Sequence, residues 1–245
     1  MDNSIRVEGS AAEKWFGYGR WSAPYWFVGP EPGMKWAEGD NLFARCQAWS
    51  DLSGDLPAEL IDCREHHERF GEMRLFTRTI RMTKPVDGRT MRPPMQETWR
   101  RLIASLLAYT GQRTDDDMIG DYQCEQWGRR NGPTCVVELS ALAAHNLGVE
   151  RARKEFLDDR IGILRERLLA NVPEFVVFYG LGSQGAYQEI AGGGFDATGF
   201  RWSGDTLCLF AEHPVAIPGE PMSWWIEKGQ QMRQMIDSRH KSDEH

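Results

Sequence analysis

The chain has 245 residues, of which 41% are hydrophobic and 27% charged, as in a soluble globular protein, and we expect a single domain over residues 1–245. No stretch approaches the roughly 20 apolar residues that cross a bilayer, and the N-terminal MDNSIRVEGSAAEK lacks the order of a signal peptide, which predicts a cytoplasmic protein without membrane contact. The net charge of −7 argues against a general nucleic-acid binder.

Five cysteines form no C-x-x-C pair, and their number is odd. Both facts argue against a disulfide framework and against a metal site built from cysteines. We therefore expect reduced, structural cysteines and no bound metal.

The first strand is predicted in YWFVGPEPGM, residues 25–34. Its first four residues favour extended backbone, and Gly29 ends the run. Pro30 and Pro32 fix their own φ and restrict the residues before them, so Glu31 lies in a turn of preset shape. Open α/β sheets place ligands at such turns, although an ordinary surface turn is the alternative.

Residues 51–92 show no clear periodicity, and Pro, Gly and Asp interrupt the stretch MTKPVDGRTMRPPM, which predicts a long exposed loop. A helix is predicted from Glu97, because apolar residues recur at helical spacing over 99–107 and Gly111 follows as a stop signal.

Strands and helices alternate in the second half of the chain. Apolar runs predict strands in 133–139 and 206–214, and residues 174–187 are predicted to form a strand, a glycine turn and the start of a helix. Apolar spacing predicts helices in 157–168 and 223–236, with Ser223 as the N-cap of the last one. This alternation predicts an α/β fold: a three-layer α/β/α sandwich with a central, mostly parallel four-stranded sheet.

Polar side chains end three of these strands. Glu31 follows the first strand, Glu138 ends the second, and His213 follows the fourth, fixed by Pro214. Because the carboxyl ends of parallel strands share one edge of a sheet, we expect their loops to converge. Glu31 could orient or deprotonate a water, and His213 could donate a hydrogen bond to developing negative charge. A histidine that is simply hydrogen-bonded in a turn is the alternative.

Positive charge is concentrated between Arg64 and Arg101, where ten Lys or Arg stand against five Asp or Glu. This local balance of +5 leaves −12 for the rest of the chain, a pattern typical of one basic face that meets a polyanion. A solvated charged face is the alternative. Within this region we predict DNA-phosphate contacts for Arg81, Lys84, Arg89 and Arg92.

Three motifs in this order resemble those of the uracil-DNA glycosylase superfamily. GPEPG at 29–33 is similar to its first-strand turn, YGLGSQGA at 179–186 to its glycine turn, and EHP at 212–214 to its late histidine motif. The resemblance implies a monomeric DNA glycosylase without metal or cofactor, which acts on DNA that contains uracil or another deaminated base.

The resemblance also implies roles for matching positions. Glu31 takes the place of the water-positioning residue, and His213 that of the histidine that stabilises the departing base. Phe43, or alternatively Trp36, would stack on the extruded base. Gly29, Pro30 and Gly33 would line the base pocket, although Pro30 has no N–H to donate. Ser183 would contact DNA.

Two positions depart from the family pattern. The asparagine that reads uracil normally ends the middle strand, whereas this chain has Glu138 there, with Asn146 as the other candidate. An ionised glutamate only accepts hydrogen bonds and could not also donate as an amide does, so the identity of the base that is removed stays open. Val215 replaces the serine that often follows the histidine motif, which removes one phosphate contact.

We therefore expect hydrolysis of the N-glycosidic bond of uracil, or of a related deaminated base, in base excision repair. The nucleotide would leave the stack and enter a pocket, and the base would depart as an anion. Two alternatives stay open: a catalytically inactive protein of the same fold that binds nucleic acid or a nucleotide, and a hydrolase of small nucleosides.

Overall fold

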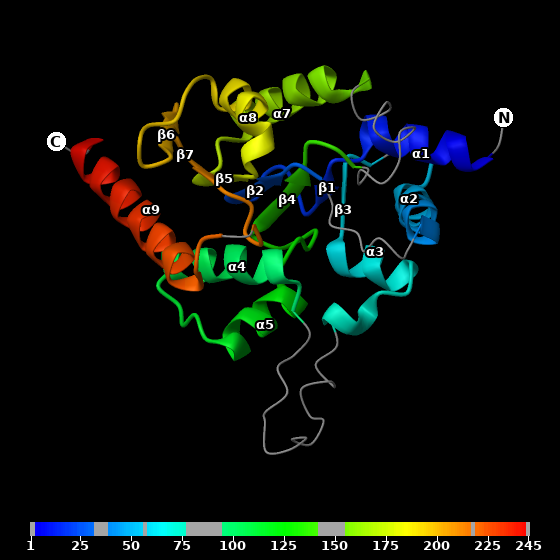
Figure 1. Ribbon diagram of the computed structural model, residues 1–245, viewed down its shortest axis with the longest axis horizontal. Helices are drawn as coiled ribbons and strands as arrows, with labels where there is room; N and C mark the ends of the chain where they lie inside the picture. Colours follow the sequence, from blue (N-terminus) through cyan, green and yellow to red (C-terminus); the bar gives the residue numbers. More distant parts are fainter. Residues whose placement is uncertain are drawn as a thin grey trace, which may run out of the picture. The chain divides into compact units, whose positions relative to one another are not determined.

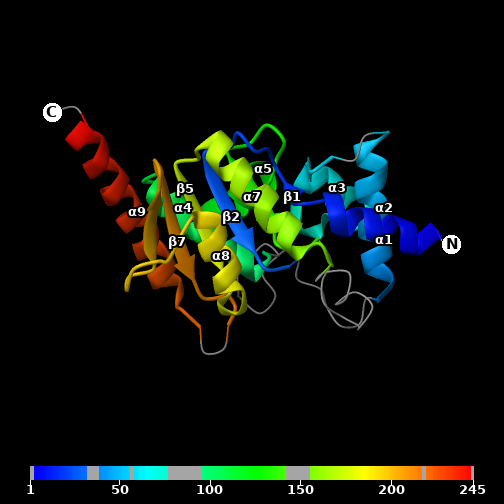
Figure 2. The same cartoon turned by 90° about the horizontal axis from the view of Figure 1, so that it is seen from above.

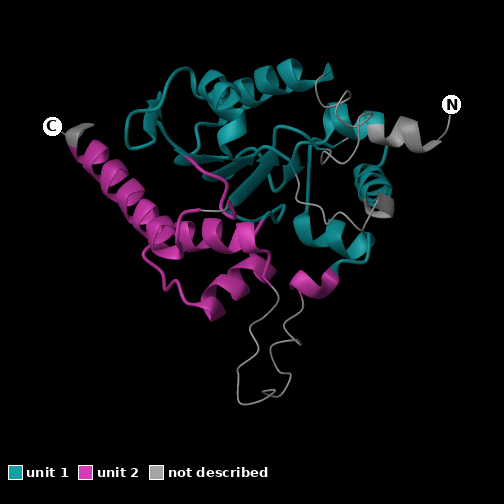
Figure 3. Cartoon of the chain, viewed as in Figure 1, with its two compact units in different colours: residues 1–72, 128–210 teal, residues 73–127, 211–245 magenta. Residues whose placement is uncertain are grey.

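The computed structural model describes residues 3–31, 39–55, 58–76, 95–141, 155–216 and 219–243. These residues form an α/β protein with seven strands and eight helices (Figure 1). The chain divides into two compact units, which we call unit 1 (Met1–Glu72 with Gly128–Phe210) and unit 2 (Met73–Trp127 with Ala211–His245; Figure 3). Each unit combines two separate stretches of chain, so no single linker divides them. The prediction of one domain stays a prediction.

The sheet has the strand order β3-β1-β4-β2-β5-β7-β6. Its strands are β1 (Gly17–Tyr18), β2 (Tyr25–Gly29), β3 (Leu60–Ile61), β4 (Thr134–Glu138), β5 (Phe175–Tyr179), β6 (Phe200–Ser203) and β7 (Thr206–Ala211). β2 runs parallel to both β4 and β5, and β1 runs parallel to β3, whereas β1 with β4 and β6 with β7 are antiparallel. The sheet is therefore mixed and mostly parallel.

The four predicted strands are confirmed as β2, β4, β5 and β7, and they lie side by side in the sheet. The predicted number of four strands was too low. β1 and β3 have two residues each, which is too short for a periodic pattern. β6 is an edge strand joined to β7 by a tight turn with Gly204 at φ 59°, and its residues are mostly half-buried.

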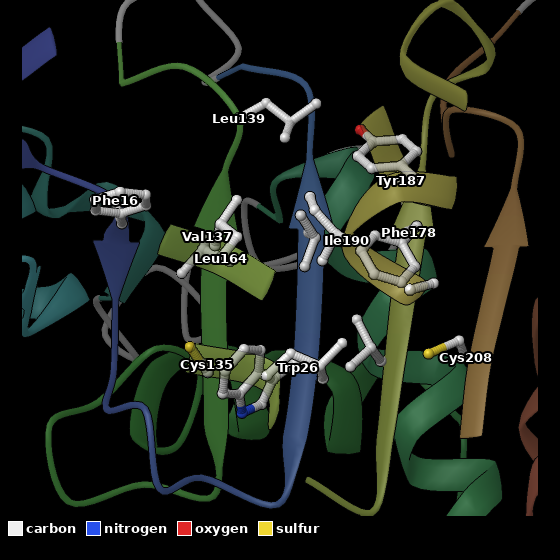
Figure 4. Close-up of a cluster of buried hydrophobic side chains, with 14 of the residues drawn as sticks. Phe16, Trp26, Cys135, Val137, Leu139, Leu164, Phe178, Tyr187, Ile190 and Cys208 are labelled. Atoms are coloured by element: carbon white, nitrogen blue, oxygen red, sulfur yellow. The ribbon is translucent and has the colours of Figure 1, made fainter. Parts of the chain in front are cut away.

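One face of the sheet in unit 1 is covered by α7 (Leu157–Asn171) and α8 (Gln184–Ala191), as Figure 1 and Figure 2 show from two directions. Apolar side chains from β2, β4 and β5 alternate toward these helices, and Figure 4 shows Trp26, Val137 and Phe178 packed with Leu164 and Ile190. The opposite set of side chains on the same strands, including Glu138, therefore points to the other face.

Unit 1 also contains α1 (Asn3–Lys14), α2 (Gly39–Ser53) and α3 (Cys63–Arg69), which lie at the β3 end of the sheet (Figure 1). The prediction that residues 51–92 are irregular was wrong for 51–53, 60–61, 63–69 and the 3₁₀ turn η1 (Met73–Phe76). α3 has the polar sequence CREHHER, so no apolar pattern marks it, but Asp62 caps it by accepting from the N–H groups of Arg64 and Glu65.

Unit 2 contains α4 (Glu97–Tyr109), α5 (Asp116–Glu125) and α9 (Met222–Asp243). α4 confirms the predicted helix, and Gly111 follows it at φ 72°. α4 and α9 cross closely, because a Cβ at Gly229 would stand 2.0 Å from the Ser105 carbonyl oxygen. α9 begins at Met222, so Ser223 lies inside the helix and the predicted N-cap was wrong. None of the described helices is long and apolar enough to cross a membrane.

Candidate active site

The order of the four long strands creates a switch point in the sheet. The chain passes from β2 to β4 on one side of it and then returns to β5 on the other side. In open α/β sheets, connections that leave neighbouring strands in opposite directions open a crevice at the carboxyl ends of those strands. The candidate site therefore lies where β4, β2 and β5 end.

Three residues lie abreast at this edge. Gly29 pairs with Glu138 across β2 and β4, and the β2–β5 register, which pairs Val28 with Phe178, places Tyr179 on the other side of Gly29. The Tyr179 hydroxyl donates a hydrogen bond of 3.2 Å to Glu138 Oε1. A Cβ at position 29 would stand 2.1 Å from Glu138 Oε2 and 2.4 Å from the Tyr179 hydroxyl. The two side chains therefore meet over a glycine that has no side chain to obstruct them.

Burial raises the pKa of the Glu138 carboxyl to about 8. The Tyr179 hydrogen bond and the charges of Arg45 and Arg160 lower this pKa, while the charge of Glu31 raises it. Oε2 of Glu138 is buried and has no hydrogen-bond partner among the described residues. At pH 7 the carboxyl is therefore mostly protonated. In that form Glu138 can donate a hydrogen bond as well as accept one, which an ionised glutamate cannot do.

Arg160 of α7 holds the backbone on which Glu138 is mounted. Its buried guanidinium donates to the carbonyl oxygens of Leu139 at 2.6 Å, Glu138 at 2.9 Å and Ala12 at 3.1 Å. It also lies 4.0 Å from the centre of the Phe16 ring. Burial lowers the pKa of Arg160 to about 9, so the group stays charged at pH 7. This one side chain therefore fixes the end of β4.

Glu31 is half-buried in the turn after β2. The turn is tied to the segment after β4, because the carbonyls of Gly29 and Pro30 accept from the N–H groups of Leu139 at 2.8 Å and Ser140 at 3.1 Å. It also packs on the turn after β5, where a Cβ at Gly180 would stand 3.3 Å from Pro30 Cγ. The three loops after β2, β4 and β5 thus converge, as the sequence predicted for the first two.

A closed cycle of hydrogen bonds beside β1 includes Arg45 of α2, whose charge acts on Glu138. Arg45 hydrogen-bonds the Tyr18 hydroxyl, which lies 2.9 Å from His66 Nδ1. His66 Nε2 lies 2.9 Å from the Arg45 carbonyl oxygen. Because a carbonyl only accepts, Nε2 carries the proton, and Nδ1 accepts from Tyr18. Burial lowers the pKa of His66 well below its usual value, which agrees with a neutral ring.

His213 belongs to unit 2 and is half-buried. The Val215 N–H donates to its Nδ1 at 3.3 Å, and burial lowers the pKa of the imidazole. The ring is therefore neutral at pH 7, with its proton on Nε2. A neutral imidazole with an Nε2–H can act as a hydrogen-bond donor, which is the form that its predicted role requires.

The remaining predicted residues fall in different places. Phe43 is half-buried on α2 and points away from the face that holds Arg45, since residues two apart in a helix lie on nearly opposite faces. Ser183 precedes α8 without capping it by its side chain and hydrogen-bonds the Tyr187 hydroxyl. Gly33, Trp36, Arg81, Lys84, Arg89, Arg92 and Asn146 lie outside the described residues, and their roles stay predictions.

Tyr179 and Arg45 were not predicted as site residues from the sequence. Tyr179 ends the predicted third strand, so a comparison of all four strand ends would have included it. Arg45 lies on a helix that no apolar periodicity marks, and no signal in the sequence connects it with Glu138. The described residues contain no group of His, Cys, Asp and Glu that could hold a metal ion. No protein-family model matches this chain, and no curated protein is similar to it in sequence.

Proposed function

We propose that this protein is a DNA glycosylase that hydrolyses the N-glycosidic bond of uracil or of a related deaminated base. The observation that supports it is the position of two carboxyl groups at the switch point, Glu31 after β2 and Glu138 at the end of β4, where burial raises the pKa of Glu138 to about 8. Cleavage of a glycosidic bond needs a carboxylate that directs water and stabilises positive charge on the sugar. It also needs hydrogen-bond donors for the departing base.

In this proposal Glu31 directs the water, and Glu138 contacts the base. Uracil presents a carbonyl beside an N–H on one edge, and a protonated carboxyl presents a donor beside an acceptor. An asparagine amide offers the same two groups. A neutral glutamate can therefore replace the asparagine that the resemblance leads one to expect.

Other parts of the proposal rest on the resemblance and on composition. His213, as a neutral imidazole, would donate to the departing base, and the basic segment with Arg89 and Arg92 would hold DNA phosphates. The three-layer α/β/α arrangement belongs to the proposal, with α7 and α8 as one outer layer. A monomeric state and a cytoplasmic location also belong to the proposal. The location agrees with the state of the five cysteines, which are buried and free.

The test is incubation with oligonucleotides that each contain one deaminated or damaged base, followed by alkaline strand scission. We expect scission at uracil or a related base, and a loss of roughly 10²–10⁴-fold in Glu31→Gln. Glu59→Gln is the control, because Glu59 is also half-buried in unit 1 but pairs with Trp21 and Arg167. DNA binding without scission at any base would instead identify a protein that binds and does not cleave.

A further inference from the structure

At the candidate site the Tyr179 hydroxyl and the Glu138 carboxyl each carry a proton, and the tyrosine donates its own to the carboxyl. The Tyr179 hydroxyl donates to Glu138 Oε1, and burial holds the pKa of Tyr179 well above its usual range, so the hydroxyl keeps its proton at neutral pH. In a carboxylic acid the carbonyl oxygen is the better acceptor, and the other oxygen carries the proton. Since Oε1 accepts from Tyr179, the proton of Glu138 belongs on Oε2.

The second oxygen is held in place without a partner. Oε2 is buried over Gly29 and has no hydrogen-bond partner among the described residues. A buried polar atom without a partner destabilises the fold and calls for a reason. A ligand that reaches Oε2 would supply the missing hydrogen bond, and Glu138 as a whole keeps part of its surface exposed.

Charged and titratable groups from several of the described elements influence this carboxyl. Arg45 of α2 and Arg160 of α7 favour its ionised form, and Glu31 in the turn after β2 opposes it. Tyr18 of β1 and Tyr187 of α8 also lie within its electrostatic reach, and burial raises the pKa of both phenols. Burial is the largest influence on Glu138 itself, so the acid stays protonated despite two nearby cations.

We infer that Tyr179 is a positioning residue that fixes the order of the hydrogen-bonding groups of Glu138, with the donor at Oε2 and the acceptor at Oε1. Glu138 can then pair with a ligand in only one arrangement. This inference rests on the proposed function. Such a pair fits a base that has a carbonyl facing Oε2 and an N–H facing Oε1. It disfavours the corresponding amino base, which would bring an N–H group against the donor on Oε2.

The selection depends on the Tyr179 hydroxyl, because a carboxylic acid alone is not directional. Its proton can lie on either oxygen, and a free acid therefore pairs equally well with a carbonyl beside an N–H and with an amino group beside a ring nitrogen. The hydrogen bond from Tyr179 removes this ambiguity. Uracil and cytosine differ in this feature alone at the edge in question, which makes them the matched pair of ligands.

The experiment compares cleavage of a single uracil and a single cytosine, each in a single-stranded DNA of adenines, by wild type, Tyr179→Phe and Tyr187→Phe. We expect the preference for uracil to fall about tenfold in Tyr179→Phe, since one mispaired hydrogen bond is no longer enforced. Tyr187→Phe should keep the preference, because the Tyr187 hydroxyl donates to the Tyr179 carbonyl at 2.8 Å and not to Glu138.

A second measurement does not depend on activity. The infrared band of a protonated carboxyl, assigned by its loss in Glu138→Gln, should disappear at a higher pH in Tyr179→Phe, because the lost hydrogen bond had lowered the pKa of Glu138. Cleavage with an unchanged preference, or a band with an unchanged midpoint, would overturn the inference. If no base is cleaved while the band moves, the proposed function is wrong and the link between Tyr179 and the Glu138 proton is supported.

Discussion

Tyr179 and Glu138 are hydrogen-bonded at 3.2 Å although the whole of β2 lies between their strands. Neighbouring strands are spaced about 4.8 Å apart, so the two side chains have to cross the intervening strand to meet. They do so over Gly29, where a Cβ would stand 2.1 Å from Glu138 Oε2 and 2.4 Å from the Tyr179 hydroxyl.

Gly29→Ala should therefore separate the two side chains. The new methyl group would overlap both Oε2 and the tyrosine hydroxyl, and overpacking of this kind costs about 1–3 kcal/mol of unfolding free energy. Glycosylase activity should fall as well. Chemical denaturation measures the first effect. Gly162→Ala in α7 is the control, because nothing lies within 4 Å of its Cβ, and it should stabilise the fold by up to about 1 kcal/mol.

Stability should fall with rising pH because of Glu138. Between the ordinary carboxyl pKa of 4.5 and about 8, the unfolded chain has lost this proton and the native chain has kept it. The contribution of Glu138 is thus complete below pH 4.5 and declines by at most about 1.4 kcal/mol per pH unit until pH 8. Glu138→Gln should flatten this decline in urea midpoints recorded from pH 5 to 9. An identical slope in the two proteins would contradict the shifted pKa.

The buried histidines of α3 make stability depend on pH in the opposite direction. Their effect can therefore be distinguished from that of Glu138. Burial lowers the pKa of His67 from 6.5 to about 3, so its stabilising contribution is complete above 6.5 and is lost as the pH falls toward 3. Acid destabilisation by His67 should therefore persist in Glu138→Gln, because that variant removes only the decline between pH 4.5 and about 8.

Arg160→Met should destabilise unit 1 by about 2–4 kcal/mol, because three buried carbonyl oxygens lose their donor. Arg160→Lys should recover only part of this, since an ammonium lacks the planar fork of a guanidinium. Arg201→Met is the matched control: Arg201 also donates to three carbonyls, those of Ala191, Gly192 and Gly194, but largely at the surface. Equal losses at the two positions would show that burial of Arg160 is not what matters.

His213→Ala should lower the chemical rate roughly 10²–10³-fold, the usual effect of removing one donor to a developing anion. Binding should change little. 5-Fluorouracil leaves more easily than uracil, so its excision should suffer less in this variant. Single-turnover rates on the two bases measure the difference, and equal losses would mean that His213 only shapes its turn.

Arg89→Ala with Arg92→Ala should weaken DNA binding while the single-turnover rate at saturating enzyme stays nearly constant. Each lost phosphate contact reduces the slope of log affinity against log salt by about 0.9 on duplex DNA. Titration at several salt concentrations gives this slope. If it does not change, the DNA is held by another part of the surface.

The long, apolar elements were predictable because their own residues encode them. β2, β4 and β5 are runs of buried residues, and α4 repeats apolar residues every three or four positions. α3 has no such pattern and depends on tertiary contacts, as its buried His66 and His67 show. β1 consists of two residues that form a strand only because β4 and β3 lie on either side.

The site was predictable at each strand end but not between them. Glu31 and Glu138 could be named from the sequence because each ends an apolar run. The contact between Glu138 and Tyr179 depends on the strand order, which brings together over one glycine two residues that are 41 positions apart in the sequence. The protonation of Glu138 depends on burial by distant segments, so it could not be read from neighbouring residues.

The position of β2 in the sheet also shapes how the protein is made. β2 is synthesised well before both of its neighbours, because Tyr25 pairs with Thr134 on one side and Phe175 on the other. Its apolar residues therefore leave the ribosome long before either neighbour exists, and closing such distant pairs is slow. During that interval an unpaired, aromatic strand can associate with other chains. Yield in the cell should therefore depend on the holdase chaperones that reach this segment first.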